Sequence, residues 1–189
     1  MNDYHSDKVY DKVSFTGEQL SKTDFDSCIF KNCDFSELHI NGSEFLECEF
    51  IDCNLGNSRI KGSSFKETRF ENSKLVGVKF HEIDSFLFKV DFMKCQLDFS
   101  SFYQMSITNF QFFDCILEGV DFTEANLSGT HFTNCNLKDA IFDATNLENV
   151  DFSTAENFRI DLDKNQLKGA TFSKNNVGDL LAIYKINII

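Results

Sequence analysis

The chain has 189 residues, including 23 Phe but no Trp and no Pro, and its formal net charge is −12 at pH 7. This length suits one domain. Residues 1–12 carry no secretory signal, and the sequence shows neither a lipidation signal nor an apolar run of about 18 residues. We therefore expect a cytoplasmic protein with no membrane role.

Residues 1–12 form a polar N-terminal lead, and a repeat of five residues follows, centred on large apolar side chains. The first fourteen centres are Phe15, Leu20, Phe25, Phe30, Phe35, Ile40, Phe45, Phe50, Leu55, Ile60, Phe65, Phe70, Leu75 and Phe80. Neither a helix, with 3.6 residues per turn, nor a flat strand, with a period of 2, keeps one face buried under a strict period of five. The chain must therefore turn a corner at every repeat.

A second period, of twenty residues, is superimposed on the first, since Phe92, Phe112 and Phe132 fall twenty apart. Twenty residues then close one coil with four sides, and like side chains stack up the inside of a square solenoid. The predicted fold class is all-β, with a parallel β-helix at 13–174 followed by a short C-terminal α-helix and tail at 175–189. Roughly eight coils, spaced about 4.8 Å apart, would make a rod about 38 Å long.

Most of the aromatic residues belong to the predicted core, because 17 of the 23 Phe are repeat centres. This leaves no stacking platform for nucleic-acid bases, and direct binding to nucleic acid is not expected.

The cysteines all stand two residues before a repeat centre, where Ser, Thr, Ala and Val also occur. They are Cys28, Cys33, Cys48, Cys53, Cys95, Cys115 and Cys135. Neighbours in one column would be about 4.8 Å apart, within reach of a disulfide. Parallel side chains, an odd number and a reducing compartment favour buried free thiols instead. The four histidines are scattered, so we expect neither zinc nor any other metal or cofactor.

The repeat slips once, between Phe80 and Leu87, where the spacing is seven rather than five. Two extra residues therefore lie within His81 to Phe86, as a bulge or a short projecting loop at a corner. We expect a joint between two stacks of coils there. Fourteen more centres follow: Leu87, Phe92, Leu97, Phe102, Ile107, Phe112, Leu117, Phe122, Leu127, Phe132, Leu137, Phe142, Leu147 and Phe152.

Met105 and Phe110 put large side chains where the wall of the coil needs small ones. Two interpretations are open: a widened coil with a small apolar surface patch, or a loop at Tyr103 to Phe113 lifted out for a partner.

Past Phe152 the repeat decays through Asn157 and resumes loosely at Leu162, Leu167 and Phe172. Beyond it, Val177, Leu180, Leu181 and Tyr184 fall at spacings of three and four, which predicts a short helix from Asn175 to Ile186, with Asn175 or Asn176 as its N-cap.

The unbroken run from Phe15 to Phe172, with segments such as Cys33-Asp34-Phe35-Ser36 and Ala125-Asn126-Leu127-Ser128-Gly129, resembles the pentapeptide-repeat proteins, whose fold is a right-handed quadrilateral β-helix. A narrower likeness lies at the two ends. There, Phe15-Thr16-Gly17-Glu18-Gln19-Leu20 and Leu167-Lys168-Gly169-Ala170 with Leu180-Leu181-Ala182-Ile183 are similar to the Qnr-type quinolone-resistance proteins.

The Qnr-type resemblance implies a homodimer joined through the C-terminal helix, and a rod that mimics duplex DNA at DNA gyrase and topoisomerase IV. The expected dimer interface is Val177, Leu180, Leu181, Tyr184 and Ile186. One departure is that Phe45 to Leu55 stays in register, so a projecting loop that many Qnr-type members carry in this region is missing, and protection from drugs is less strongly implied than binding.

Charge is distributed unevenly along the chain. Residues 1–58 hold 12 acids and 4 bases, residues 92–173 hold 12 acids and 5 bases, and a basic belt separates them. The belt comprises Arg59, Lys61, Lys66, Arg69, Lys74 and Lys79. The acidic residues that we expect to meet Lys and Arg of a partner are Asp98, Glu118, Asp121, Glu124, Asp139, Asp143, Glu148 and Asp151.

No His accompanies a Ser or Cys at a useful spacing, and no glycine-rich phosphate loop is present, so no enzyme is expected. Three hypotheses stay open: a topoisomerase-binding DNA mimic, an acidic protein-interaction scaffold, and a structural repeat protein with no partner.

Overall fold

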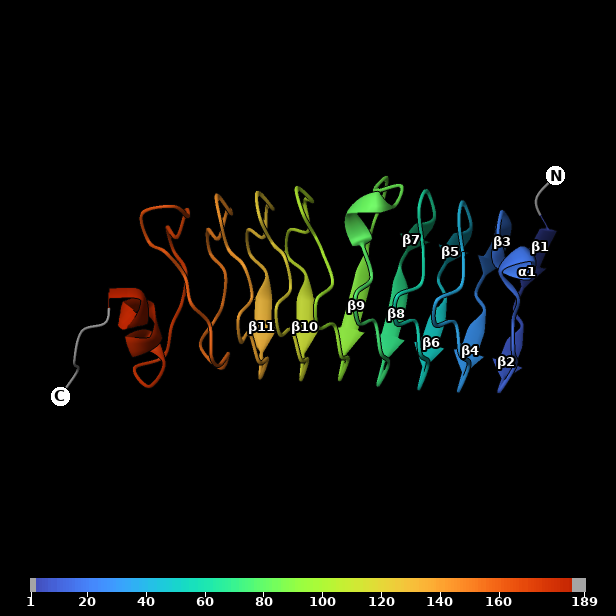
Figure 1. Ribbon diagram of the computed structural model, residues 1–189, viewed down its shortest axis with the longest axis horizontal. Helices are drawn as coiled ribbons and strands as arrows, with labels where there is room; N and C mark the ends of the chain where they lie inside the picture. Colours follow the sequence, from blue (N-terminus) through green and yellow to red (C-terminus); the bar gives the residue numbers. More distant parts are fainter. Residues whose placement is uncertain (1–2, 185–189) are drawn as a thin grey trace.

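The computed structural model describes residues 3–184, without the side chains of Glu18 and of residues 182–184. Figure 1 shows a rod of stacked coils with the two ends of the chain at opposite ends of the rod. All strand pairs are parallel, and the fold is the predicted all-β solenoid.

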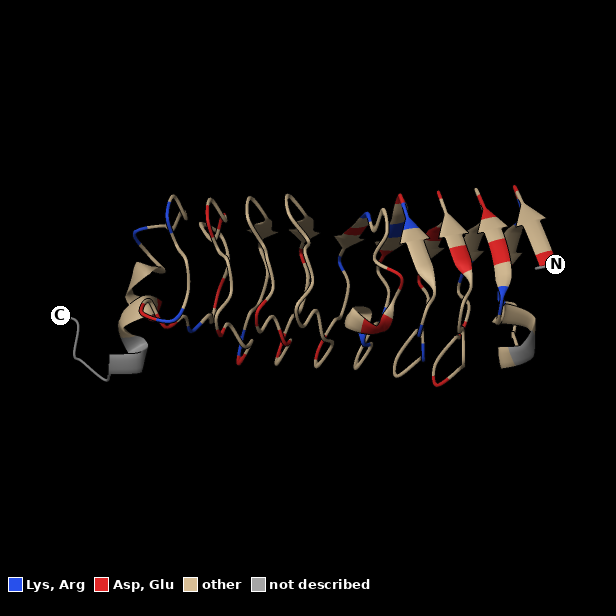
Figure 2. Cartoon of the chain, turned by 90° about the horizontal axis from the view of Figure 1, so that it is seen from above, with Lys and Arg blue, Asp and Glu red and all other residues tan. Residues whose placement is uncertain are grey.

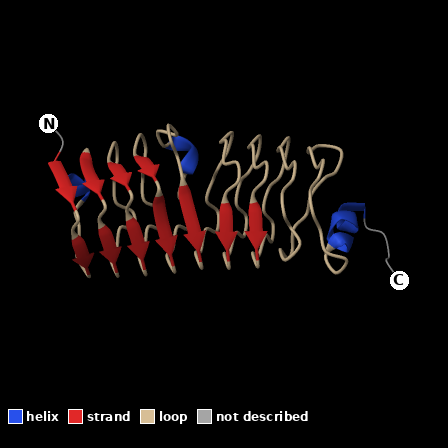
Figure 3. Ribbon diagram, turned by 180° about the vertical axis from the view of Figure 1, so that it is seen from behind, coloured by secondary structure: helices blue, strands red, loops and turns tan. Residues whose placement is uncertain are grey.

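Short strands build two sheets along the rod (Figure 3). The four-stranded sheet has the order β1 (Asp3–Ser6), β3 (Thr23–Asp26), β5 (Glu44–Leu46) and β7 (Ser64–Lys66). The seven-stranded sheet runs β11 (His131–Thr133), β10 (Gln111–Phe113), β9 (Val90–Met93), β8 (Thr68–Glu71), β6 (Glu49–Ile51), β4 (Ile29–Lys31) and β2 (Val9–Asp11). The helical segments are α1 (Gly17–Leu20) and two 3₁₀ helices, η1 (Phe80–Glu82) and η2 (Val177–Tyr184).

The rod has four faces, which we number in the order in which each coil meets them. The first face carries the seven-stranded sheet and the fourth face the four-stranded sheet. Isolated bridges continue the pairing elsewhere. The second face carries the column Asp34, Asn54, Lys74, Gln96, Ile116 and Asn136, the third face carries His39 with Arg59 and the column Lys79, Ser101, Asp121 and Ile141, and the fourth face also carries Ser106, Asn126 and Asn146.

The predicted repeat centres form stacks of rings inside the coil. The Phe112 ring lies 5.3 Å from Phe92 and 5.2 Å from Phe132, nearly parallel to both, and it meets Phe122 edge-on at 6.4 Å. Each ring thus has neighbours above, below and beside it, with almost no exposed surface. Burial of these rings is the main source of stability, since the rod has no second hydrophobic layer.

The corners explain why the period is five. Two residues after most centres the backbone enters the left-handed region, for example at Asn32 (φ 53°) and Asn57 (φ 55°). Asn and Gly adopt this conformation at low cost. Gly77 shows a second constraint, because a Cβ there would lie 2.4 Å from the Asn57 side-chain oxygen one coil away. The turn recurs in every coil and sets the length of each side.

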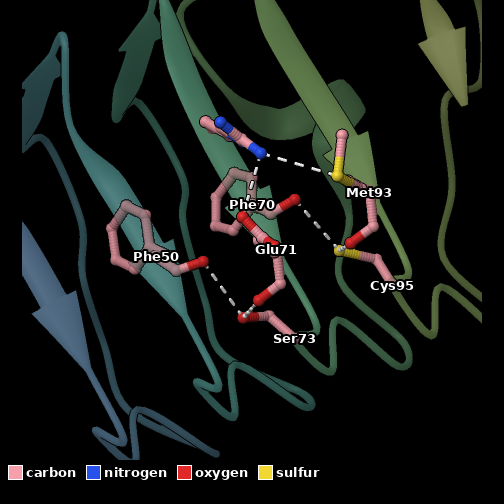
Figure 4. A network of polar contacts seen from close by, with 7 residues as sticks. Phe50, Phe70, Glu71, Ser73, Met93 and Cys95 are labelled. Atoms are coloured by element: carbon pink, nitrogen blue, oxygen red, sulfur yellow. Dashed lines mark hydrogen bonds and ion pairs between the residues drawn. The ribbon is translucent and has the colours of Figure 1, made fainter. Parts of the chain in front are cut away.

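The small wall residues donate hydrogen bonds to the coil before them. Ser73 Oγ donates to the Phe50 carbonyl at 3.2 Å, and Cys95 Sγ donates to the Phe70 carbonyl at 3.4 Å (Figure 4). Cys48 Sγ does the same to the Phe25 carbonyl at 3.5 Å. A donor at this position satisfies a buried carbonyl of a repeat centre. Cys, Ser and Thr are therefore interchangeable here, and the expectation of free, buried thiols is confirmed.

The N-terminal lead is not separate from the repeat, contrary to the sequence prediction. Within residues 1–12, β1 pairs with β3 and β2 pairs with β4 in the same parallel register as later coils. The Tyr10 ring stacks on Phe30 at 5.1 Å, as a repeat centre would. The sequence did not predict Tyr10 as a repeat centre because every other centre is Phe, Leu or Ile.

The two-residue insertion is confirmed, but Leu87 is not a centre. Strand β8 pairs with β9 so that Phe70 meets Phe92, and the Leu87 side chain is 65% exposed while Phe88 packs against the core. The seven-stranded sheet runs straight through this region, which argues against a joint between two stacks. The extra residues are taken up between the third and first faces, at η1 and the turn after it.

Met105 and Phe110 are both buried, and the bridges of Ser101 and Ser106 to the next coil persist, so no loop is lifted out at Tyr103 to Phe113. The Phe110 ring packs on Phe88 at 5.4 Å, which links this widened wall to the insertion one coil earlier.

The last coil is closed by side chains that the repeat did not predict. Phe158 and Ile160 are buried, whereas Asn157 and Leu162, which continued the five-residue spacing, are exposed. Phe172 stacks on Phe152 at 5.3 Å, as expected. The C-terminal helix is a 3₁₀ helix rather than an α-helix.

The stacked rings make the effect of core truncation predictable. Phe122→Ala should reduce the free energy of unfolding by about 3–5 kcal/mol, because the rings above and below cannot move together to fill the cavity. Chemical denaturation followed by far-UV circular dichroism measures this change. Ile141→Ala, at an exposed site of the third face, is the control and should change it by less than about 0.5 kcal/mol. A loss below about 1 kcal/mol for Phe122→Ala would contradict the packing described here.

The buried thiols should resist modification. Burial raises the pKa of Cys48 and of Cys53 to about 12, so both stay protonated near neutral pH. Because the thiolate is the nucleophile, a thiol reagent at pH 8 should modify the native protein very slowly and all seven cysteines once guanidinium is added. Rapid stoichiometric labelling of the folded protein would contradict this prediction.

Candidate partner-binding surface

The eight predicted acidic residues do not lie on one face. Asp98 and Glu118 belong to the second face, Asp121 and Asp143 to the third, and Asp139 to the corner between these faces, as their places beside the bridged columns show. The three others lie further around the rod: Glu124 at the next corner, Glu148 on the fourth face and Asp151 on the first. Five of the eight therefore form one continuous surface, which we call the acidic surface: Asp98, Glu118, Asp121, Asp139 and Asp143.

Several of these carboxylates already have partners along their columns. Glu118 accepts a bond from Lys138 Nζ at 2.6 Å, and its own N–H donates to Asp98 at 3.1 Å. This contact raises the pKa of Lys138. The carboxylates of Asp143 and Asp139 have no hydrogen bond or ion pair among the described residues. The acidic surface thus offers fixed carboxylates beside unpaired ones.

Outside the acidic surface, Gln104 Nε2 donates to Glu124 at 2.7 Å, and His131 lies 3.6 Å from Asp151. Partial burial acts to raise the pKa of Asp151, but hydrogen bonds from Ser153 and the nearby His131 outweigh this effect, and the pKa is lowered. Asp151 and Glu148 face away from the acidic surface, and one partner surface cannot contact all eight residues at once.

The basic belt winds around the rod. Figure 2 shows Asp and Glu recurring along the chain, with Lys and Arg interrupting them near the middle. Lys66 pairs with Glu44 at 2.6 Å on the fourth face, and Arg69 pairs with Glu71 at 2.9 Å on the first. Lys74 lies on the second face. Only Arg59, Lys61 and Lys79 gather together, on the third face, so this face changes sign along its length.

An exposed apolar bulge lies where the spacing of the repeat rises to seven residues, and the period of five did not predict that its side chains point outward. Phe86 and Leu87 are 68% and 65% exposed beside a groove of about 470 Å³ that Phe88, Val90 and Phe110 help to line. Adjacent exposed apolar side chains beside a groove are a feature of many contact surfaces, whereas single ones such as Phe99 are common.

The C-terminal end carries a second apolar groove. Leu180 is buried against the core, and the Asn176 side chain donates to the Phe152 and Ala155 carbonyls at 2.8 and 2.9 Å, which closes the last coil. Val177 and Leu181 remain 46% and 36% exposed, in a groove of about 500 Å³. Of the predicted dimer interface, the Tyr184 side chain and Ile186 lie outside the described residues.

Within residues 3–184, no helix is long and apolar enough to cross a membrane, and no group of three or more His, Cys, Asp or Glu side chains is arranged to hold a metal ion.

Comparisons with known proteins agree with this architecture. The family model described as a pentapeptide repeat region matches residues 23–102, and the model for pentapeptide repeats in eight copies matches residues 115–153. No curated protein matches the sequence.

Two solved structures of QnrB1, a plasmid-mediated fluoroquinolone resistance protein, are similar in fold. A trypsin-treated variant is 17% identical with a TM-score of 0.66, and the alignment covers 100% of this chain and 98% of that one. The full-length protein is 16% identical with a TM-score of 0.64, and the alignment covers 97% and 100% of the two chains. At these identities the likeness establishes the shared solenoid.

Proposed function

Because this chain belongs to the pentapeptide-repeat proteins, we propose that it is a DNA-mimicking rod that binds DNA gyrase or topoisomerase IV and protects the enzyme from quinolones. The observation that carries the proposal is the acidic surface on a rod that matches QnrB1, a fluoroquinolone resistance protein, over nearly the whole of both chains.

The spacing of carboxylates on the acidic surface suits a partner protein that normally binds DNA. Successive coils repeat at about 4.8 Å. Asp98 and Glu118 follow one another in one column, at a spacing of the same order as the roughly 3.4 Å between charges along one strand of duplex DNA. The columns are held by main-chain hydrogen bonds, such as that from the Phe122 N–H to the Ile141 carbonyl at 2.9 Å. Such preformed charges bind a basic groove with little ordering of side chains.

The apolar bulge supports a second candidate function, that of an acidic protein-interaction scaffold for a different partner. Phe86 and Leu87 would then anchor the contact, because large exposed apolar side chains dominate the affinity of many interfaces. The two functions differ in their salt dependence, which is steep for the DNA mimic and weak for an apolar anchor.

The first experiment measures gyrase supercoiling and quinolone-induced cleavage with increasing amounts of the protein. Loss of drug-induced cleavage complexes at micromolar protein supports the DNA mimic. No change in either assay, for both gyrase and topoisomerase IV, means that the proposal is wrong.

Charge reversal tests the acidic surface. Replacing Glu118, Asp121 and Asp143 with Lys should leave the fold intact. Asp143 is exposed, Glu118 and Asp121 are half-buried outside the core, and the ion pair and hydrogen bond that these two lose contribute about 1 kcal/mol each. The effect on gyrase should fall at least about tenfold, as expected when several ion pairs become repulsive.

The matched control replaces Glu67 and Glu71, in the basic belt, with Lys. These residues pair with Lys89 and Arg69 at exposed sites, where ion pairs contribute little to stability. An equal loss of gyrase effect in the control would indicate nonspecific charge dependence rather than a defined surface.

We also propose that two copies associate through the C-terminal apolar groove. Leu181→Asp places a charge in that contact and should give a monomer, as measured by light scattering at several concentrations. Val9→Asp, an exposed apolar site in β2 at the opposite end of the rod, is the control and should leave the mass unchanged. A wild-type protein that is monomeric at micromolar concentration would contradict the dimer.

A further inference from the structure

The main-chain ladder of the third face ends after Ile141, and within its length it is interrupted between the Arg59 and Lys79 coils. Arg59 N–H donates to the Leu38 carbonyl, and Ile40 N–H donates to the Arg59 carbonyl, both at 2.8 Å. The corresponding bonds between the Arg59 and Lys79 coils are absent, and neither Ile60 N–H nor Lys79 N–H has a hydrogen bond in the described part of the chain. The cause is the two-residue insertion after Phe80.

The insertion changes the hydrogen-bond partner of the corner that follows Ile60. The repeat would pair Gly62 N–H with the His81 carbonyl, but Gly62 N–H donates to the Glu82 carbonyl at 2.9 Å. The Lys79 carbonyl accepts a 3₁₀ hydrogen bond from Glu82 N–H. In a parallel ladder, the N–H of a centre points toward the next coil and the N–H before a centre points toward the previous one. The N–H groups of Ile60 and Lys79 are therefore both directed into the gap.

The gap opens into a groove of about 650 Å³, within the range of small-molecule sites. Its lining includes Asn57, Ser58, Arg59, Ile60, Lys61 and Lys79. Ser58 is only 5% exposed, and its hydroxyl has no hydrogen-bond partner. The same unpartnered hydroxyl occurs at Ser100, which has the equivalent wall position two residues before a third-face centre but does not line this groove. The Ser58 hydroxyl therefore belongs to the buried wall, and the groove's own donors are its main-chain and cationic groups.

The charge of this groove is opposite to that of most of the rod. Arg59, Lys61 and Lys79 are exposed and form no ion pair among residues 3–184, whereas Lys66 and Arg69 of the same belt are paired. Glu82 is the one acidic residue in the lining, against three cations. The groove is thus a local positive site on an acidic protein.

We propose that this groove binds a phosphate group, either as inorganic phosphate or as the phosphate of a nucleotide. A phosphate oxygen accepts hydrogen bonds only, and the groove offers donors from the main chain of Ile60 and Lys79 and from the side chains of Arg59, Lys61 and Lys79. Unpaired main-chain N–H groups beside Lys and Arg are a recurrent way of holding phosphate. This inference does not depend on the proposed topoisomerase role.

Calorimetric titration of the full chain at constant ionic strength tests whether the groove binds phosphate. Inorganic phosphate, pyrophosphate and ADP are the separate ligands, and sodium chloride is the blank. Saturable binding of inorganic phosphate identifies the free anion as sufficient. Saturable binding of ADP alone shows that the rest of the nucleotide contributes. No saturable binding of any of the three at millimolar concentration overturns the proposal.

Three variants locate the site. Arg59→Gln and Lys79→Gln should each weaken binding about tenfold, because each removes a charged donor. Lys74→Gln makes the same change of charge on the second face of the same coil and should alter affinity by less than about twofold. Equal affinities for Arg59→Gln, Lys79→Gln and wild type would place the anion elsewhere and refute the assignment.

Discussion

The structure depends on the register between successive coils. Each coil donates and accepts main-chain hydrogen bonds with its neighbours, and this register places each repeat centre on the one twenty residues away, as when Phe25 pairs with Phe45 and Phe45 with Phe65. The stacked rings exclude water from those bonds, and the bonds hold the rings at stacking distance. The corner residues with positive φ keep each side at five residues. A change in the register, in the stacked rings or in the corner turns therefore misaligns the other two.

The outer surface is free of this constraint and carries the features that differ between one part of the rod and another. Side chains on either side of a centre point outward, so charge can vary without disturbing the core. The ladder nevertheless gives the charges a regular spacing. On the third face, Asp121 continues the column of Arg59 and Lys79, and Asp143 lies in the neighbouring column of Lys61. A partner that extends along this face therefore meets both signs.

The two-residue insertion has consequences on both sides of the place where it occurs. On the third face it leaves the N–H groups of Ile60 and Lys79 without partners and opens the basic groove. Toward the fourth face it turns Phe86 and Leu87 outward and brings Phe88 onto Phe110. Both irregular features of the surface therefore have one origin, in a fold that otherwise repeats. Deviations from local regularity often coincide with functional sites.

The sequence by itself determined the architecture, because a period of five within a period of twenty has one physical solution: a four-sided coil whose centres, from Phe15 to Phe80 and from Phe92 to Phe152, point inward. It also predicted the free thiols and the place of the insertion. Only the tertiary structure decided how the insertion is absorbed, with Phe88 rather than Leu87 packed inward, because the energy of a bulge depends on contacts with Phe110 in another coil. It also decided that Tyr10 belongs to the core and that the acidic residues divide among the faces. Counting charges along the sequence does not show on which face of the rod each side chain lies. The face determines which carboxylates one partner can contact together.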